Sequence, residues 1–399
     1  MVKFTRRKLK NGMNVLFEKR EIPVVSVSIS NRFGGAFENE KIKGIAHVIE
    51  HMVFTGTKTR THEDISREIE KKGGILNAFT ANEVTSFWFK LPSEHLFAGL
   101  DILTDVLNNP KFDNEKFEKE KKVILEEIKM YHDDPARNVF DKINEVLYEK
   151  PFGVGIIGTK ESVSSLERNF VYDFYRKHYS SENFIVTIVG NADIDEVCSY
   201  LEKNFFSMNK KLPEIRVKKK NGESVEEREG IDQAHFVFAM HAPLMNEKEF
   251  AVLEVLNAYL AEGMSSKLFL KIREEKGLAY AVKGLIEAEK NYSHYCIYAG
   301  TTKKAIPQIK KIILEEFEKI KDMKEKELEE AKEQMIGLRK ITSEESARVM
   351  QEILFSEIAS RAEEYYENEE KIRKVTLEQV KKLAQSLIKK YSIVTIAPK

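Results

Sequence analysis

The segment Gly44-Ile45-Ala46-His47-Val48-Ile49-Glu50-His51-Met52-Val53-Phe54 carries two histidines and a glutamate at helical spacing. In an α-helix, side chains four residues apart lie one above the other, so His47 and His51 project from one face and Glu50 from nearly the same face. Two imidazoles placed in this way are half of the tetrahedral ligand set that zinc takes in proteins. The segment therefore predicts a helix with a partial zinc site, beside which Glu50 could take a proton from water.

The same spacing also fits a plainer interpretation, in which two surface histidines and a solvated glutamate lie on an ordinary helix. A catalytic zinc site needs a third protein ligand and keeps its fourth position open for water. The choice between the two interpretations therefore depends on whether the chain provides an acid on a separate, rigid element.

The run 113–131 predicts a long helix that begins with Asp113 or Asn114 as its N-cap. Glu120 and Glu127 are seven residues apart in this run, so they lie on one stripe close to its apolar face. Glu126 is rotated by about 100° from Glu127. Helical phase therefore favours Glu127 over Glu126 as the inward-pointing acid. The apolar positions with helical spacing are Phe117, Ile124, Ile128 and Tyr131.

With these residues in place, the chain resembles the pitrilysin-type zinc peptidases, or inverzincins, which carry H-x-x-E-H and include insulin-degrading enzyme and mitochondrial processing peptidase. Gly56-Thr57 and Glu126-Glu127 are also similar to that family, and the likeness is greatest to its short, processing-peptidase-like bacterial and archaeal members. The resemblance implies one zinc ion per chain and general-base catalysis. His47, His51 and Glu127 would be the zinc ligands. Glu50 would be the general base, and Glu120 would be the acid that orients a ligand.

Two predicted strands, 75–80 and 84–91, follow the motif helix. Asn77, Ala78 and Thr80 match an Asn-Ala-x-Thr stretch that the family carries on an edge strand beside the metal. The resemblance implies that this strand pairs with the substrate. Strand addition holds an extended peptide through its backbone, largely independently of its side chains. The alternative is an ordinary strand with a polar face.

A repeated four-residue sequence indicates a duplicated domain. Ile-Val-Thr-Ile occurs at 185–188 and again at 393–396, and each copy follows a predicted helix with Leu-Glu near its start. A polar, lysine-rich stretch from Met208 to Glu223, broken by proline and glycine, marks the seam between the copies. We therefore expect an N-terminal zinc-binding domain at 1–211, a linker at 212–231 and a C-terminal homologous domain without metal at 232–399.

The resemblance implies an α+β fold with two duplicated halves. Each half would be a mainly antiparallel sheet with helices packed on one face, and the halves would face each other around a cavity. The second half lacks H-x-x-E-H, but Arg273 and Tyr280 match an Arg and a Tyr that reach the family's active site from the facing half. A guanidinium and a phenol can hydrogen-bond a developing oxyanion. For Tyr280, the alternative is a core aromatic.

The composition suits a globular protein with more than one domain, since 42% of the 399 residues are hydrophobic. Lys and Arg total 65, as do Asp and Glu, so no overall attraction to nucleic acid or anionic lipid is expected. No apolar run is long enough to span a membrane. Cys198 and Cys296 lack C-x-x-C spacing and are predicted to be buried free thiols, as in a cytoplasmic protein. The charged segment 304–340 predicts helices with surface ion pairs.

Together, these features predict a zinc metalloendopeptidase that acts on unfolded or extended peptides and, as the resemblance implies, forms a homodimer. One alternative is a non-catalytic structural or peptide-binding subunit, which the retention of His47, Glu50, His51 and Glu127 disfavours. Another is a subunit of a heterodimeric processing peptidase. The presence of both Arg273 and Tyr280 in this chain disfavours that alternative. Manganese or cobalt in place of zinc is also compatible with the sequence.

Overall fold

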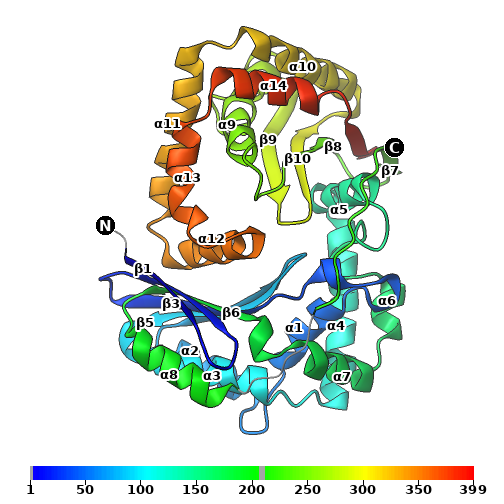
Figure 1. Ribbon diagram of the computed structural model, residues 1–399. Helices are drawn as coiled ribbons and strands as arrows, with labels where there is room; N and C mark the ends of the chain where they lie inside the picture. Colours follow the sequence, from blue (N-terminus) through cyan, green and yellow to red (C-terminus); the bar gives the residue numbers. More distant parts are fainter. Residues whose placement is uncertain (1–2, 206–211) are drawn as a thin grey trace. The chain divides into compact units, whose positions relative to one another are not determined.

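The computed structural model describes residues 3–205 and 212–399 (Figure 1). Residues 208–211 of the expected seam lie outside this part of the chain. The chain divides into two compact units, each of which collects segments from both halves of the sequence. The first unit comprises Met1–Lys129, Gly155–Arg216 and Thr342–Ile358, and the second comprises Met130–Val154, Val217–Ile341 and Ala359–Lys399.

The first unit contains a six-stranded sheet in the order β1-β2-β6-β3-β5-β4. Its strands pair antiparallel except for β2 and β6, which are parallel. β4 forms one edge of the sheet, as expected for the strand that carries Asn77. The strands are β1 (Lys3–Lys8), β2 (Asn14–Lys19), β3 (Val24–Asn31), β4 (Ile75–Thr80), β5 (Thr85–Pro92) and β6 (Phe184–Gly190).

The second unit contains a five-stranded sheet in the order β7-β11-β8-β10-β9. This order repeats β2-β6-β3-β5-β4 of the first sheet strand for strand, and β7 and β11 are again the one parallel pair. The chain therefore folds as α+β with two similar halves, which confirms the duplication. The strands are β7 (Glu223–Arg228), β8 (Ala234–His241), β9 (Ala279–Ala288), β10 (Ser293–Thr301) and β11 (Ser392–Pro398).

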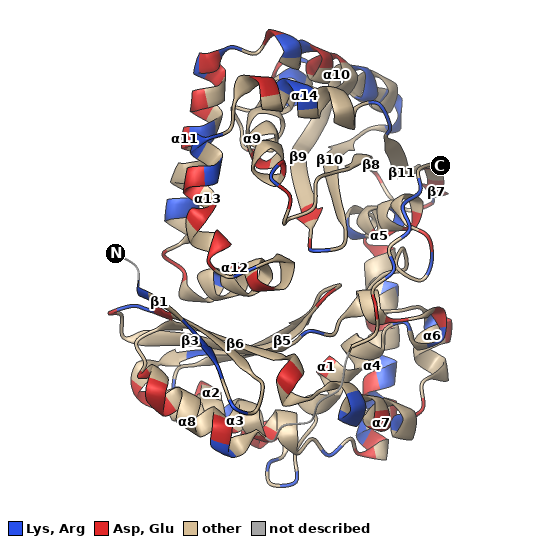
Figure 2. Cartoon of the chain, viewed as in Figure 1, with Lys and Arg blue, Asp and Glu red and all other residues tan. Residues whose placement is uncertain are grey.

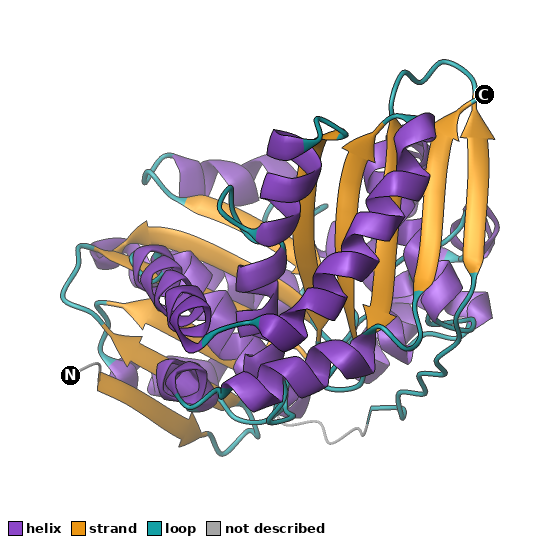
Figure 3. Cartoon of the chain, turned by 90° about the horizontal axis from the view of Figure 1, so that it is seen from above, coloured by secondary structure: helices purple, strands orange, loops and turns teal. Residues whose placement is uncertain are grey.

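The helices of the first unit bury their apolar faces against one face of its sheet. Figure 3 shows the helices in purple and the strands in orange. Val25, Val27 and Ile29 of β3 point into this shared core. Asp113 caps the long helix as expected, since its Oδ1 accepts hydrogen bonds from the backbone N–H groups of Glu115 and Lys116 at 2.9 and 3.2 Å. Thr61 forms a capping box with Asp64. The helices are α1 (Ile45–Val53), α2 (His62–Glu70), α3 (Leu96–Asn108), α4 (Asn114–Asp133), α6 (Lys160–Ser165), α7 (Arg168–His178) and α8 (Ile194–Asn204). The last residues of α4, from Met130, belong to the second unit.

The second unit builds its own core from β8, β10 and the apolar faces of its helices. Basic and acidic residues are interspersed along several of these helices (Figure 2), and Lys326 and Glu330 of α11 form one of the i, i+4 ion pairs expected there. The helices are α9 (Phe250–Leu260), the π-helical segment η5 (Phe269–Glu275), α10 (Ile306–Lys319), α11 (Glu325–Thr342), α13 (Glu364–Arg373) and α14 (Leu377–Leu387).

The two halves exchange equivalent helices. α5 (Pro135–Leu147) precedes β6 in the chain but packs in the second unit, where Arg228 donates to Asn138 at 2.6 Å. α12 (Ser346–Ala359) precedes β11 but packs, up to Ile358, in the first unit. In the sequence, α5 lies within the expected domain 1–211 and α12 within the expected domain 232–399.

α12 covers the face of the first sheet opposite to its helical layer. Strand side chains alternate between faces, so Ser26 of β3 points away from Val25 and Val27, and its hydroxyl lies 2.9 Å from that of Ser346. Arg6 donates two hydrogen bonds, of 2.7 and 2.6 Å, to the buried carboxylate of Glu357. α12 is therefore anchored to the sheet by polar contacts on a buried surface.

None of the helices in the described ranges, 3–205 and 212–399, is both long and apolar enough to cross a membrane. Cys296 is buried in β10, and Cys198 is half-buried in α8. Both thiols are free, as expected, but only one of the two is fully buried.

Candidate active site

The motif helix α1 is held at its N-terminus by a buried ion pair that sequence reasoning missed. Gly44, the N-cap, has no side chain to offer, and its φ of 93° suits glycine. Glu38 instead accepts hydrogen bonds from the backbone N–H groups of Gly44 and Ala46, at 3.0 and 2.8 Å. Nζ of Lys43 lies 3.4 Å from Oε2 of Glu38 and donates a hydrogen bond to the carbonyl of Gly35 at 2.9 Å. A carboxylate at this helix end satisfies free N–H groups and complements the helix dipole.

α1 and α4 bring the three expected ligands together. Nε2 of His47 and Nε2 of His51 each lie 3.8 Å from Oε2 of Glu127. Their potential ligand atoms all lie within 4.8 Å of one another, and no other group of this kind occurs among the residues described. Zinc bonds of about 2.0–2.1 Å in tetrahedral geometry separate ligand atoms by roughly 3.4 Å, so a small contraction would fit the ion.

The two histidines have different surroundings. Burial, reinforced by the nearby His51, lowers the pKa of His47 to about 3, so its ring is neutral and able to bind a metal. Its Nδ1 is buried and has no hydrogen-bond partner within the described structure. Burial also opposes the charged form of His51, but a hydrogen bond to Glu120 and the charges of Glu50, Glu120 and Glu127 outweigh it and raise the pKa of His51.

Glu120 occupies the place expected of an acid that orients a ligand. Nδ1 of His51 donates to Oε2 of Glu120 at 3.1 Å. A carboxylate on one imidazole nitrogen fixes the ring and leaves the other nitrogen free for a metal. On the same helix, the side chain of Glu126 is 70% exposed and pairs with Lys129 at 2.6 Å. Glu127 therefore faces the histidines and Glu126 faces away, in agreement with the helical phase.

Glu50 is held by a residue of the neighbouring edge strand. Oγ1 of Thr80 donates to Oε2 of Glu50 at 2.5 Å. Burial raises the pKa of Glu50, while this hydrogen bond and the nearby His51 oppose the rise. The sequence suggested Thr80 as part of a substrate strand but contained no signal that its hydroxyl meets the expected general base.

The edge strand β4 has backbone groups that point away from β5. Ala81 donates to the carbonyl of Val84 where the β4–β5 hairpin closes. Because hydrogen-bonded and non-hydrogen-bonded pairs alternate along an antiparallel ladder, the backbone groups of Ala78 and Thr80 point to the open side of β4. The N–H of Ala78 is covered there by the side-chain oxygen of Asn77, at 2.8 Å. An extended peptide could pair with this edge.

Arg273 and Tyr280 lie in the second unit, whereas the other predicted site residues lie in the first. Arg273 is in η5, with its guanidinium 4.9 Å from the ring centroid of Phe269. Tyr280 is in β9, and a Cβ placed on Gly300 would lie 2.5 Å from two of its ring atoms. Tyr280 is 49% exposed, which excludes the core-aromatic alternative.

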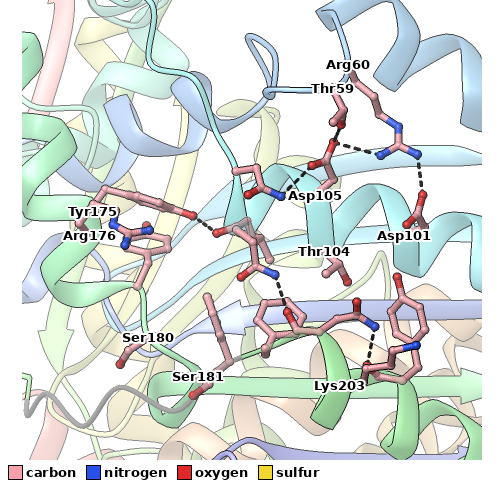
Figure 4. Close-up of a pocket in the computed structure, with 18 residues that line it drawn as sticks. Thr59, Arg60, Asp101, Thr104, Asp105, Tyr175, Arg176, Ser180, Ser181 and Lys203 are labelled. Carbon is pink, nitrogen blue, oxygen red and sulfur yellow. Dashed lines mark hydrogen bonds and ion pairs between the residues drawn. The ribbon is translucent and has the colours of Figure 1, made fainter.

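The first unit also contains a pocket of about 520 Å³, shown in Figure 4. α3, α7 and α8 contribute most of its lining. Arg60 at its rim pairs with Asp101 at 2.5 Å and with Asp105 at 3.0 Å. None of the predicted site residues lines this pocket, so the pocket is separate from the cluster around Glu127.

Comparisons with known sequences cover most of the chain. The family described as Insulinase (Peptidase family M16) matches residues 14–160, and the one described as Peptidase M16 inactive domain matches residues 165–335. A relative from Rickettsia bellii, named an uncharacterized zinc protease, is 32% identical over 88% of this chain and 86% of its own length. A second relative of that description, from Bacillus subtilis, is 30% identical over 98% of this chain and 97% of its own.

Solved structures share the fold over the full chain. A protease from Helicobacter pylori matches with a TM-score of 0.94 at 20% identity, and the match covers 100% of both chains. A peptidase M16 inactive domain from Pseudomonas fluorescens matches with a TM-score of 0.88 at 17% identity, over 100% of this chain and 98% of that one. At these identities, the likeness concerns the fold.

Proposed function

The chain belongs to the insulinase family, peptidase family M16, and we propose that it is a zinc-dependent endopeptidase that hydrolyses peptide bonds of unfolded or extended peptides. The observation that carries the proposal is the convergence of His47, His51 and Glu127 beside Glu50. Relatives named zinc proteases support the choice of metal and of reaction.

His47, His51 and Glu127 would hold one zinc ion per chain. Two imidazoles and one carboxylate are a ligand set found in catalytic zinc sites, and Glu120 supports the ring of His51 as such sites require. When bound, zinc supplies a Lewis acid that lowers the pKa of a coordinated water and polarises the scissile carbonyl. Manganese or cobalt could serve the same role.

Glu50 acts in this proposal as general base and then as general acid. Its carboxylate takes a proton from the attacking water as the water oxygen bonds to the carbonyl carbon. When the carbon–nitrogen bond breaks, Glu50 returns that proton to the leaving amine. Arg273 and Tyr280 would donate hydrogen bonds to the oxyanion formed between these steps.

The substrate would pair with the open edge of β4 near Asn77, Ala78 and Thr80. Backbone pairing needs an extended peptide and reads few side chains, so unfolded or flexible segments are the substrates that fit. We also propose a homodimer and a cytoplasmic location, without nucleic-acid or membrane partners. Light scattering on the purified chain tests the homodimer.

Zinc content and peptide cleavage by the purified chain test the proposal. We expect about one zinc per chain, cleavage of a quenched unstructured peptide, loss of cleavage with a chelator and recovery when zinc is restored. A chain that binds no zinc and cuts nothing would contradict the proposal and favour a non-catalytic subunit. Cleavage that appears only with a second protein would favour a heterodimeric processing peptidase.

A further inference from the structure

The contact between Thr80 and Glu50 joins two elements that are far apart in sequence. The hydroxyl of Thr80 must donate this hydrogen bond, because an ionised carboxylate only accepts. A hydrogen bond to a charged group is stronger than one between neutral groups. One oxygen of Glu50, Oε2, is therefore held by β4.

Both partners of this contact are fixed by their own surroundings. Glu50 lies on α1, whose first turn is held by Glu38. Thr80 ends β4, where the preceding residue, Phe79, stacks on Phe355 of α12 with ring centroids 6.0 Å apart. Because side chains alternate along a strand, Thr80 points away from this aromatic contact and towards α1. The hydrogen bond thus joins two supported elements and not two mobile side chains.

The backbone and the side chain of Thr80 make different contacts. Its N–H and C=O belong to the open edge of β4, where an extended peptide can pair. Its hydroxyl is occupied by Glu50. The resemblance implied only that this strand pairs with the substrate, and a direct contact from the Thr80 side chain to substrate would compete with a short hydrogen bond that is already made.

We propose that Thr80 is a positioning residue, whose hydroxyl holds the Glu50 carboxylate in the orientation that proton transfer from water needs. This inference rests on the proposed peptidase function and gives Thr80 a role in turnover instead of in substrate affinity. Without the hydroxyl, the carboxylate of Glu50 can rotate, and fewer bound complexes have an oxygen aligned with the water.

Two substitutions at Thr80 separate the hydroxyl from the shape of the side chain. Thr80→Val keeps the shape and removes the donor, whereas Thr80→Ser keeps the donor. We expect Thr80→Val to lower kcat by about 10- to 100-fold with KM within about twofold, since a whole general base contributes about 10²- to 10⁴-fold. Thr80→Ser should retain at least about a third of the wild-type kcat, and both variants should retain zinc.

Thr187→Val is a matched control for loss of a threonine hydroxyl. Thr187 lies in β6 of the same sheet, is fully buried, and its Oγ1 has no hydrogen-bond partner among the residues described. Its replacement should leave kcat, KM and zinc content unchanged. A loss at Thr80 but not at Thr187 would therefore report the contact with Glu50.

Peptide binding gives a readout that does not depend on turnover. In the Glu50→Gln background, which should bind peptide without cutting it, adding Thr80→Val should change the peptide Kd by less than about twofold. A loss of affinity of about tenfold or more would make Thr80 a substrate-binding residue and overturn the inference.

The outcomes separate this inference from the proposed function. If wild type cleaves and Thr80→Val cleaves with the same kcat, or if Thr80→Ser is as impaired as Thr80→Val, the inference fails and the peptidase function stands. If zinc-loaded wild type does not cleave at all, both fail.

Discussion

Nδ1 of His51 lies 3.1 Å from Oε2 of Glu120, while Nε2 of the same ring lies 3.8 Å from Oε2 of Glu127. The two carboxylates come from the same helix, α4, two turns apart. A carboxylate on Nδ1 keeps a proton there and leaves the Nε2 lone pair for a metal. The two glutamates should therefore fail in different ways when replaced.

Replacing Glu120 should weaken zinc binding without abolishing it. Glu120→Gln keeps a side chain of similar size but removes the charge that orients His51, and loss of such a support costs about 10- to 100-fold in metal affinity. Competition with a chromophoric chelator measures the affinity. Glu118→Gln is the matched control, because Glu118 is on the same helix with its side chain 65% exposed. Equal zinc affinity in the Glu120 and Glu118 variants would refute this role.

Replacing Glu127 should remove zinc, whereas replacing its neighbour should not. Glu127→Gln deletes the carboxylate ligand, so the purified variant should contain little zinc. Glu126→Gln changes only an exposed ion pair with Lys129 and should retain the wild-type zinc content. Metal analysis of both variants measures the difference. Zinc lost at Glu126 but kept at Glu127 would reverse the assignment.

The buried pair under α1 should matter for stability. Glu38→Gln leaves Lys43 without its carboxylate in a site where both side chains are at most 2% exposed. Breaking such a pair by removing one partner costs about 3–5 kcal/mol. Urea unfolding should show this loss, and Glu38→Gln combined with Lys43→Met should recover part of it. A single variant that unfolds like wild type would show that the pair does not support the helix.

Asp141 of α5 should make the stability of the second unit depend on pH. Burial, with the nearby charges of Glu145 and Glu287, raises the pKa of Asp141 to about 6 from an ordinary 3.8. The folded state then binds more protons than the unfolded state between these values, so stability falls as pH rises through that window.

Asp141→Asn removes this penalty. The variant should exceed wild type by about 1–3 kcal/mol in unfolding free energy near pH 7.5 and gain nothing below about pH 4. Asp133→Asn, at a side chain that is 80% exposed, should show neither effect. An Asp141→Asn gain that is the same at both pH values would rule out titration as its cause.

Local sequence patterns were sufficient to predict the helices that carry the candidate site residues. The spacing of His47 and His51 predicted α1, and helical phase chose Glu127, because both depend only on the geometry of one helix. The repeated Ile-Val-Thr-Ile predicted the duplication, since each copy is the strand, β6 or β11, that inserts into the same place of its sheet.

Features that depend on which surfaces meet could not be predicted. An amphipathic helix shows which face is buried but not which sheet covers it, so the exchange of α5 and α12 was missed. Glu38 and Lys43 lie in a charged loop that would normally be solvated, and their burial follows from packing around α1. The Thr80 contact likewise needs β4 and α1 to be placed together.

The most direct test of the account is the zinc content and peptidase activity of Glu50→Gln beside wild type. Because Glu50 is not among the three ligand residues, the variant should keep about one zinc per chain and bind peptide, yet lose at least about 10²-fold in cleavage rate. A zinc-loaded Glu50→Gln that cleaves as fast as wild type would contradict the account.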